Sequence, residues 1–505
     1  MTIAEAASKD GEQSSKKPKV IIIGAGTSGL RAAEVLIESG CEVVVLEARD
    51  RVGGRIATSS KLGLPLDLGA NWIHGDQGNP IIDLAKRAQC SYSVDELDDT
   101  VVFAPDGTPL PKRLGQELET KMWDYFDDGM EYSAQNFDAI KTNISFIEYY
   151  KARTDEDFPE GAAAGGDDEK RKEYQMQIVE ILGGIVATDI KRQDLKNLHL
   201  EKPIPGENLF MSSTYGPVMT LMAKTAVENG CVQLNAPVEQ VETVYTAAGP
   251  VHTVCTKDGE ALKADGVIVT IPLGSLKQDR IKFTPPMPEN MRQAIKHLGY
   301  GSLEKTYISF PTAFWATEST SYFVFLAPEY APATNSERKL ISTLSLAHLP
   351  QPYNQPTLLF YTHGDISKRI TDMLQLDSPE ASRKKILEFF QPYFSRLPGY
   401  VADDPDCMPV DILSTNWLND EYAGNGSYTN FPVGLVDGVE DIKTIREGVP
   451  GQRLWFCGEH TAPLLGLASV SGAYWAGEIT ARRCLVGFGM MSEEAERALA
   501  MGDGL

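Results

Sequence analysis

Three glycines and one acid near the N-terminus have types and a spacing that could bind phosphate and ribose. The sequence Gly24-Ala25-Gly26-Thr27-Ser28-Gly29 follows a short apolar run, and Glu47 closes the next apolar run. In this pattern the first glycine permits a tight turn, and the second lets backbone N–H groups approach a pyrophosphate at a helix N-terminus. The third allows a helix to pack closely on a strand, and the acid binds ribose hydroxyls. These residues therefore predict a bound dinucleotide.

The elements that must position these residues are a strand, a helix and a second strand. Residues 20–23 are continuously apolar and too short for a helix, which indicates a buried strand. Leu30, Ala33 and Leu36 then share one helical face until Gly40, and residues 41–46 form a second apolar run. Because parallel strands with both faces covered read as unbroken apolar runs, we expect a βαβ unit of an α/β fold.

A second motif, Arg51-Val52-Gly53-Gly54-Arg55, follows at once. Its glycines would let the main chain run beside another part of a dinucleotide, with Arg55 free to grip phosphate in a bidentate fork. The order of these two motifs resembles the N-terminus of the flavin-containing amine oxidase superfamily. The resemblance implies FAD as cofactor. It also implies a two-domain α/β architecture, with a Rossmann-like FAD-binding domain and a mixed-sheet α+β substrate domain.

The resemblance extends from Lys19 to about Leu485 and implies a discontinuous FAD-binding domain. That domain would comprise residues 19–90, 230–290 and 430–490, and the substrate domain residues 91–229 and 291–429. Residues 1–18 would be a disordered leader and 491–505 a C-terminal tail. Within the substrate domain, apolar periodicity predicts one amphipathic helix over 114–150. The Gly-, Ala- and acid-rich residues 154–170 predict a flexible loop.

The resemblance also assigns cofactor contacts along the chain. The main chain of Gly69 and Ala70 would lie beside the flavin, Trp417 against its dimethylbenzene edge, and Val238 beside the adenine. Near the C-terminus, free N–H groups of a helix that opens around Val470 would suit the negative pole of the flavin. Other expected cofactor contacts are Gly24, Gly26, Ser28, Gly29, Glu47, Ala48, Arg49, Gly54, Arg55, Asn71, Trp72, Gly458 and Glu459.

Lys305 is the expected catalytic residue. Alternation along an apolar strand puts it on the same side as Leu303 and Tyr307, where an ammonium needs a polar partner. The superfamily places a lysine at this position, joined through one water to flavin N5. The alternative is a lysine on an edge strand in solvent.

Four residues are expected to contact the substrate. By resemblance, Tyr428 forms one wall of an aromatic cage, His74 faces the substrate, and Ser469 stands where monoamine oxidases carry the second wall. Asp189 falls near an acid of plant polyamine oxidases; the alternative is a surface acid. Ser427 replaces the cysteine that links FAD covalently in monoamine oxidases, so the resemblance implies non-covalent FAD.

Charge and composition narrow the function classes. The net charge of the 505 residues is −23, and residues 91–170 hold 20 Asp or Glu against 7 Lys or Arg. Such a field repels nucleic acid and membrane surfaces and attracts a cationic substrate, or it merely solvates a face. No apolar stretch is long enough to span a membrane.

Cysteine and histidine usage and the two termini carry further expectations. The seven cysteines include no CxxC pair, and the seven histidines lack ligand spacing, so we expect reduced thiols and no metal. The polar start lacks a secretory signal, and the end, Gly502-Asp503-Gly504-Leu505, does not resemble a peroxisomal address. An intracellular, cytoplasmic protein is expected.

The resemblance is greatest to fungal and animal polyamine oxidases, which carry a small residue at the Ser469 position. It implies hydride transfer from the carbon beside an amine nitrogen to flavin N5, with dioxygen reduced to hydrogen peroxide and the imine hydrolysed to an aldehyde and an amine. Spermine or spermidine would be the substrate. Three alternatives remain: a flavin oxidase or dehydrogenase of the same fold for amino acids or nitrogen heterocycles, a protein-lysine demethylase, and a non-enzymatic FAD-binding protein. The sequence leaves the oligomeric state open.

Overall fold

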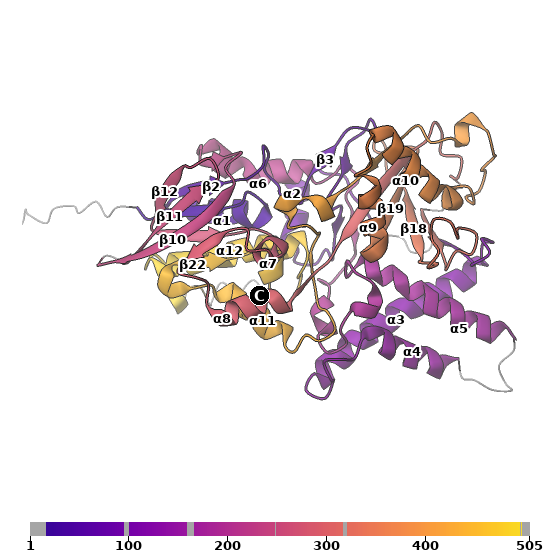
Figure 1. Ribbon diagram of the computed structural model, residues 1–505, viewed down its shortest axis with the longest axis horizontal. Helices are drawn as coiled ribbons and strands as arrows, with labels where there is room; N and C mark the ends of the chain where they lie inside the picture. The colour runs from indigo at the N-terminus through magenta and orange to yellow at the C-terminus, as the bar shows by residue number, and fades with distance from the viewer. Residues whose placement is uncertain are drawn as a thin grey trace, which may run out of the picture.

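A computed structural model describes residues 17–94, 100–158, 166–247, 249–316, 321–494 and 496 of the chain. It consists of two domains that combine helices and strands, each built on its own main sheet (Figure 1). The first domain lies on the left of Figure 1 and holds both the N-terminal strand and the C-terminal helix. The second lies on the right and is formed by intervening segments of the chain.

A five-stranded parallel sheet organises the first domain, with strand order β22-β13-β1-β2-β9. Val20 and Ile22 of β1 pack into the core on one face, and Ile21 and Ile23 pack into the core on the other. Because both faces are covered, the strand is apolar at every position rather than at alternate ones. The strands are β1 (Lys19–Ile23), β2 (Glu42–Leu46), β9 (Val232–Gln233), β13 (Gly266–Val269) and β22 (Leu454–Phe456).

Different layers cover the two faces of this sheet. One face carries four helices: α1 (Thr27–Glu38), α2 (Pro80–Arg87), α6 (Gly216–Glu228) and α12 (Val470–Gly487). The other face carries a four-stranded sheet of order β12-β11-β10-β14 and three further helices. These are β10 (Val238–Thr246), β11 (Gly249–Thr256), β12 (Ala261–Ala264), β14 (Lys282–Thr284), α7 (Leu273–Lys277), α8 (Glu289–His297) and α11 (Gly438–Glu447).

A six-stranded mixed sheet, of order β20-β16-β19-β18-β17-β7, forms the second domain. All its pairs are antiparallel except β17 with β7. Two helices, α9 and α10, pack on it through an aromatic core that includes Phe360 and Phe390. The bounds are β7 (Thr100–Phe103), β16 (Leu303–Ser309), β17 (Tyr322–Phe325), β18 (Ile341–Ser345), β19 (Thr357–His363), β20 (Asp411–Ser414), α9 (Gly364–Met373) and α10 (Pro379–Phe394).

A layer of three helices borders this sheet (Figure 1, lower right). Its helices differ from the single helix expected over 114–150 and from the loop expected over 154–170. It contains α3 (Lys112–Asn136), α4 (Phe146–Asp157) and α5 (Gly166–Ile178). The single helix expected over 114–150 is therefore wrong, because the Glu148 carboxylate accepts the Ser145 N–H at 2.8 Å and caps a new helix. The loop expected over 154–170 is also wrong at both ends, where α4 and α5 are joined by Lys172 and Asp155 at 2.7 Å. Residues 159–165 of that loop lie outside the described residues.

Short elements connect these layers. In the part of the chain that the structure describes, no helix is both long and apolar enough to cross a membrane. The short strands are β3 (Thr58–Ser59), β4 (Leu66–Asp67), β5 (Trp72–Ile73), β6 (Ser93–Val94), β8 (Leu209–Phe210), β15 (Gly299–Tyr300) and β21 (Thr429–Asn430). The 3₁₀ turns are η2 (Val179–Gly184), η3 (Ile190–Arg192), η4 (Leu198–Glu201), η5 (Leu346–His348), η6 (Pro405–Cys407), η7 (Trp417–Asn419), η8 (Glu421–Ala423), η9 (Pro450–Gln452) and η10 (Glu459–Thr461).

Candidate active site

A cavity of about 1100 Å³ is lined by residues of both domains. One part lies at the carboxyl ends of the parallel strands, where ligands of open α/β sheets bind. Another part reaches α3 and the mixed sheet of the second domain. Every site residue expected from the sequence lines this cavity except Gly29 and Asp189.

The three glycines of the first turn have distinct surroundings. Gly24 has φ +110°, and a Cβ there would lie 2.5 Å from Thr270 Oγ1. A Cβ on Gly29 would lie 2.0 Å from the carbonyl oxygen of Gly24, so this residue is where α1 packs on the turn. A Cβ on Gly26 would meet no protein atom within 4 Å, because Gly26 borders the cavity. Only Gly26 therefore leaves space that a ligand can fill.

Glu47 is buried at the end of β2 and lines the cavity beside this turn. Its carboxylate accepts the N–H of Ala25 at 2.8 Å and the N–H of Arg49 at 2.9 Å. These bonds fix the carboxylate next to the β1–α1 turn while each oxygen keeps a lone pair for a further donor. Such a carboxylate can accept the hydroxyls of a ribose.

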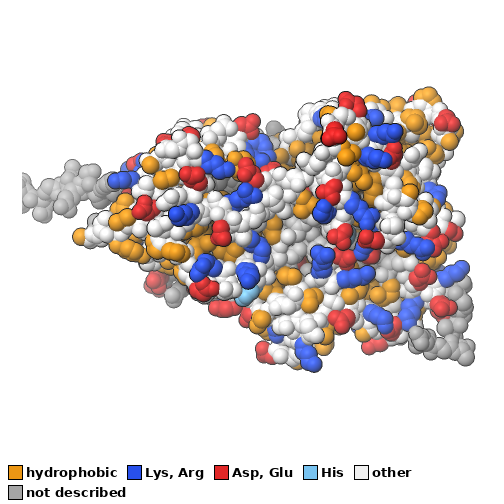
Figure 2. All heavy atoms as spheres, viewed as in Figure 1, with side chains coloured by type: hydrophobic (Ala, Val, Ile, Leu, Met, Phe, Trp, Pro, Cys, Tyr) orange, Lys and Arg blue, Asp and Glu red, His pale blue; other side chains and the backbone are white. Residues whose placement is uncertain are grey.

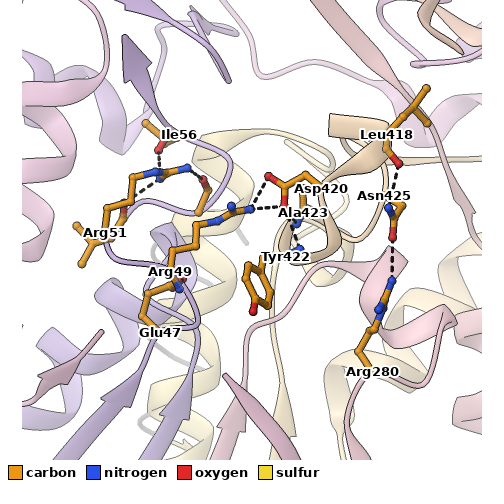
Figure 3. Close-up of polar contacts among 12 residues, drawn as sticks. Glu47, Arg49, Arg51, Ile56, Arg280, Leu418, Asp420, Tyr422, Ala423 and Asn425 are labelled. Atoms are coloured by element: carbon orange, nitrogen blue, oxygen red, sulfur yellow. Dashed lines mark hydrogen bonds and ion pairs between the residues drawn. The ribbon is translucent and has the colours of Figure 1, made fainter. Parts of the chain in front are cut away.

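Arg49 and Arg51 have structural partners, which Figure 3 shows. Nη2 of Arg49 lies 2.8 and 2.9 Å from the two carboxylate oxygens of Asp420, so this ion pair joins the first motif to a distant segment. Arg51 donates to the carbonyls of Val52, Gly54 and Ile56 at 3.0–3.2 Å. Arg51 therefore stabilises the conformation of the loop at residues 51–56.

Arg55 is not the free cation that its motif predicts. Its Nη1 donates to Glu459 Oε1 at 2.9 Å and to the carbonyl of Ser427 at 2.6 Å. The pKa of the Arg55 guanidinium is raised: burial lowers it, but Tyr300 and Glu459 more than compensate. Glu459 also accepts the N–H of Thr429 at 3.3 Å, so this buried pair joins three segments at the cavity wall. A phosphate contact of Arg55 stays a prediction.

Lys305 lies on β16 with only 3 % of its surface exposed, and it lines the cavity. Its Nζ donates to the carbonyl of Asp67 at 3.1 Å and to the carbonyl of Gly69. The hydroxyl of Tyr307, two residues along the strand, donates to the same Asp67 carbonyl at 2.6 Å. Burial lowers the pKa of Lys305, and the Asp67 carboxylate only partly opposes this. The polar partner that the alternation requires is therefore the main chain at 67–69.

Aromatic residues surround this lysine. Trp417 is buried and donates from Nε1 to the carbonyl of Leu68 at 3.2 Å. The hydroxyl of Tyr361, from β19, accepts Asn71 Nδ2 at 2.9 Å and Trp72 Nε1 at 3.1 Å. Nζ of Lys305 lies 5.8 Å from the centre of the Tyr361 ring. Segments far apart in the sequence thus converge on residues 68–72.

Tyr428 lines the cavity near this group and is held by its hydroxyl, which donates to the carbonyl of Gly184 at 2.5 Å. The preceding residue, Ser427, uses its hydroxyl to bridge the main chain of Leu303, with bonds of 2.9 and 3.0 Å. Burial raises the pKa of the Tyr428 phenol, so the ring stays neutral. The Tyr428 ring is therefore held at its hydroxyl end by Gly184 and at its backbone end by the neighbouring Ser427.

We expect FAD to leave the polypeptide when the protein is precipitated with acid. None of the seven cysteines, all of which lie within the described residues, lines the cavity, so no thiol is placed to form a thioether. The measurement is flavin absorbance in supernatant and pellet, compared with a covalently flavinylated protein as control. Flavin retained in the washed pellet would contradict non-covalent binding.

His74 and Ser469 lie on another part of the wall. His74 Nδ1 is 3.3 Å from the amide oxygen of Asn208, and burial lowers the pKa of this imidazole. The hydroxyl of Ser469 donates to the carbonyl of Gly466 at 2.6 Å and accepts the N–H of Gly472 at 3.0 Å, where it caps α12. The second aromatic wall is therefore replaced here by a helix cap.

Asp189 lies outside the lining of this cavity. It pairs with Lys339 Nζ at 2.6 Å and accepts the N–H of Lys191 at 3.0 Å. Both bonds lower the pKa of Asp189 against the effect of burial. Its carboxylate is thus occupied within the protein, and substrate contact at Asp189 stays a prediction without support from the geometry.

Several lining residues were not expected from the sequence. On α3 the lining includes Glu119, Met122, Phe126 and Asp127, and η4 ends in Glu201 at the same cavity. The periodicity of α3 marks its apolar face, but the sequence does not show that part of this face borders a cavity. Tyr361 and His363 are further unexpected lining residues, because the 340–415 region carries no recognisable motif.

Surface charge is less one-sided than the composition of 91–170. Figure 2 shows basic and acidic side chains interspersed over the visible face. Several acids of this stretch pair with local bases, such as Asp155 with Lys151 at 3.0 Å and Glu156 with Arg153 at 2.7 Å. Part of that acidic charge is therefore neutralised locally, and the acids that line the cavity are better placed to meet a cation. Among the described residues, no group of three or more His, Cys, Asp or Glu is placed to hold a metal.

Comparison with known proteins matches the geometry. A model of the flavin containing amine oxidoreductase family matches residues 27–485. The chain is 28 % identical over 495 residues to probable polyamine oxidase 4 of Arabidopsis thaliana, covering 96 % of this chain and 89 % of that protein. It is 26 % identical to lysine-specific histone demethylase 1 homolog 3 of rice, of which it covers only 53 %. A solved putrescine oxidase double mutant has the same fold, with a TM-score of 0.67 at 20 % identity, covering 93 % of this chain and 99 % of that one.

Proposed function

Because the chain belongs to the flavin containing amine oxidoreductase family, we propose that this FAD-dependent amine oxidase acts on polyamines such as spermidine or spermine. Its curated relatives include polyamine oxidases that match along nearly their full length. FAD fits the dinucleotide end of the cavity, where Gly26 leaves open space and Glu47 offers its carboxylate. When bound, FAD supplies the chemistry: it accepts a hydride from the carbon beside an amine nitrogen and passes the electrons to dioxygen.

The observation that carries this proposal is the lining contributed by α3. Met122, Phe126 and Met130 give apolar walls, while Glu119 and Asp127 stand eight residues apart on the same helix. Eight residues correspond to about 12 Å along a helix axis. Among the described lining residues of α3 there is no lysine or arginine. Such a wall suits a ligand in which ammonium groups are separated by methylene chains.

The protein's own share of the reaction is binding and proton placement. The face of Tyr428 orients the neutral amine, because an aromatic ring packs against an alkyl amine without competing for its proton. The ammonium of Lys305, held on the carbonyls of Asp67 and Gly69, is placed to hold or give up a proton at Nζ. The buried surroundings lower its pKa and so make that exchange easier near neutral pH.

A second candidate is an oxidase of the same fold for an amino acid or a nitrogen heterocycle. Ser469 favours it, because a serine stands where monoamine oxidases carry the second aromatic wall. An amino acid also needs a cation for its carboxylate. Lys202 lines the cavity, but the α3 wall has acids and Lys305 is already engaged by carbonyls, so this candidate ranks second.

Peroxide release from a substrate panel separates the two. We expect spermine, spermidine or their acetylated forms to give kcat/KM values at least about 100-fold above those of any amino acid, since an amino-acid carboxylate would face the acids that line the cavity. A heterocyclic amine such as a piperidine is included in the panel to test the nitrogen-heterocycle alternative. Faster peroxide release with an amino acid or the heterocycle would favour the second candidate.

A further inference from the structure

Residues 417–428 form one short segment that lines two parts of the cavity. Tyr422, in its middle, lies at the dinucleotide end, where the guanidinium carbon of Arg49 is 5.5 Å from the centre of the Tyr422 ring. Trp417 and Tyr428, at its two ends, lie near β16, the strand of the expected catalytic lysine. A dinucleotide that extends from one part of the cavity to the other would therefore run along this segment.

An ion pair joins the middle of this segment to the first domain (Figure 3). Nη2 of Arg49 lies 2.8 and 2.9 Å from the two carboxylate oxygens of Asp420. The side chains are only 15 % and 23 % exposed, so water screens this pair less than a surface pair. Arg49 also lines the cavity, two residues after Glu47 at the end of β2. The ion pair therefore connects the dinucleotide end of the cavity to a segment that forms another part of its wall.

Asp420 also shapes the segment itself. Its Oδ1 accepts the N–H groups of Tyr422 and Ala423, both at 3.0 Å, and so caps η8. Asparagine caps turns of this kind about as well as aspartate does, because its amide oxygen accepts the same bonds. Replacing Asp420 with asparagine therefore removes the charge but keeps the cap. The effect of the ion pair can then be measured without loss of the local structure.

The neighbouring ion pairs of the segment are more exposed. Glu421, the next residue, pairs with Arg280 at 3.5 Å and with Lys257 at 3.8 Å, and these side chains are 42–49 % exposed. Exposed pairs of this length contribute little, because water and salt screen them. Among these ion pairs, the one that resists opening of the cavity wall most is therefore that of Asp420.

We propose that Asp420 is a positioning residue for the cofactor: through Arg49 it keeps the 417–428 segment closed against the first domain, and FAD leaves the enzyme faster when this ion pair is lost. FAD fits the dinucleotide end beside Glu47, so a wall that is tied to Arg49 restrains its exit. The proposal requires bound FAD but no particular amine. It therefore goes beyond the proposed function and is tested without a substrate.

The test measures the release of FAD from the FAD-loaded enzyme without any amine. The enzyme is diluted into a large volume of buffer, and the rise in flavin fluorescence gives the rate at which FAD leaves. Asp420→Asn removes the charge, Arg49→Met removes its partner, and the double variant completes a cycle that isolates the interaction of the two residues. Glu478→Gln is the matched control, because it removes an ion pair of similar exposure, with Arg31 at 2.7 Å, and neither residue lines the cavity.

We expect Asp420→Asn to release FAD about tenfold faster than the wild type, as the loss of a partly buried charged hydrogen bond allows. In the Arg49→Met background the same substitution should change the rate by less than about twofold, because the partner is already gone. Glu478→Gln should stay within about twofold of the wild type. Arg49→Lys should release FAD more slowly than Arg49→Met, since one nitrogen contacts both carboxylate oxygens and an ammonium can supply that charge.

A wild-type release rate in Asp420→Asn would overturn the proposal. Slower release would also overturn it, since it would show that Asp420 withholds Arg49 from the cofactor. Equal effects of Asp420→Asn in the two Arg49 backgrounds would rule out the ion pair as the cause, and an equal effect of Glu478→Gln would make the cause a general loss of stability. Where Asp420→Asn does not fold, Arg49→Lys and Arg49→Met decide, and equal rates in these two would refute the role of the charge.

Discussion

Replacing Lys305 with methionine is expected to slow turnover about 100- to 1000-fold while the enzyme keeps its FAD. Methionine is close to lysine in shape, but its thioether cannot carry or exchange a proton. The carbonyl of Gly69 would lose its Lys305 donor, whereas the carbonyl of Asp67 would keep the Tyr307 hydroxyl. The residues at the dinucleotide end, such as Gly26 and Glu47, are untouched. Steady-state kcat and the flavin-to-protein ratio are the two measurements.

Lys277→Met provides the matched control. This lysine also donates to main-chain carbonyls, those of Ile295, Lys296 and Leu298 at 2.6–3.0 Å, and burial lowers its pKa to about 8. It does not line the cavity. We expect Lys277→Met to lower the unfolding temperature but to leave kcat within about twofold. Equal kcat in Lys305→Met and the wild type would remove Lys305 from the reaction.

Alanine at Gly29 and at Gly26 should damage the protein in two different ways. At Gly29 the new methyl would sit 2.0 Å from a backbone oxygen, which no rotamer can relieve. We expect a loss of stability of about 1–3 kcal/mol or more in the FAD-free protein. At Gly26 the methyl would meet no protein atom, and φ is −78°, which alanine tolerates. Stability should then change by less than about 0.5 kcal/mol, while FAD affinity falls at least about tenfold because the methyl occupies the path of the pyrophosphate.

Thermal unfolding of the FAD-free variants and FAD titration of the same samples give the two values. We expect a crossed pattern, in which Gly29→Ala mainly loses stability and Gly26→Ala mainly loses FAD affinity. Wild-type FAD affinity in Gly26→Ala would show that the cofactor does not pass this glycine. Equal stability losses in both variants would show that Gly26 also has a packing role.

The parts of the site that the sequence could predict are those carried by short, contiguous motifs. Gly24 to Gly29 and Glu47 belong to one βαβ unit, so spacing alone brings them together, and the structure places the glycine turn and the acid at one cavity. Lys305 could be singled out because strand alternation made its surroundings apolar. The structure supplies what alternation could not, namely that the ammonium partners are the carbonyls of 67 and 69.

The missed features depend on contacts between distant residues. Asp189 is an acid, as a contact to a cationic substrate would be. Its partner Lys339 is 150 positions away, so no local sequence pattern indicates the ion pair. Glu201 ends a 3₁₀ turn too short for periodicity, so only the folded chain shows its exposure to the cavity. The break between α3 and α4 did have a local signal in Ser145 and Glu148, which continuous apolar periodicity obscured.

Anaerobic mixing of the FAD-loaded enzyme with spermidine tests the central claim most directly, because it removes dioxygen and follows the cofactor itself. We expect the yellow absorbance of oxidised flavin to disappear in a single turnover. Admission of air should restore it with about one hydrogen peroxide per flavin. Flavin that keeps its oxidised spectrum with spermidine and with every other amine of the panel would contradict an amine oxidase acting at this site.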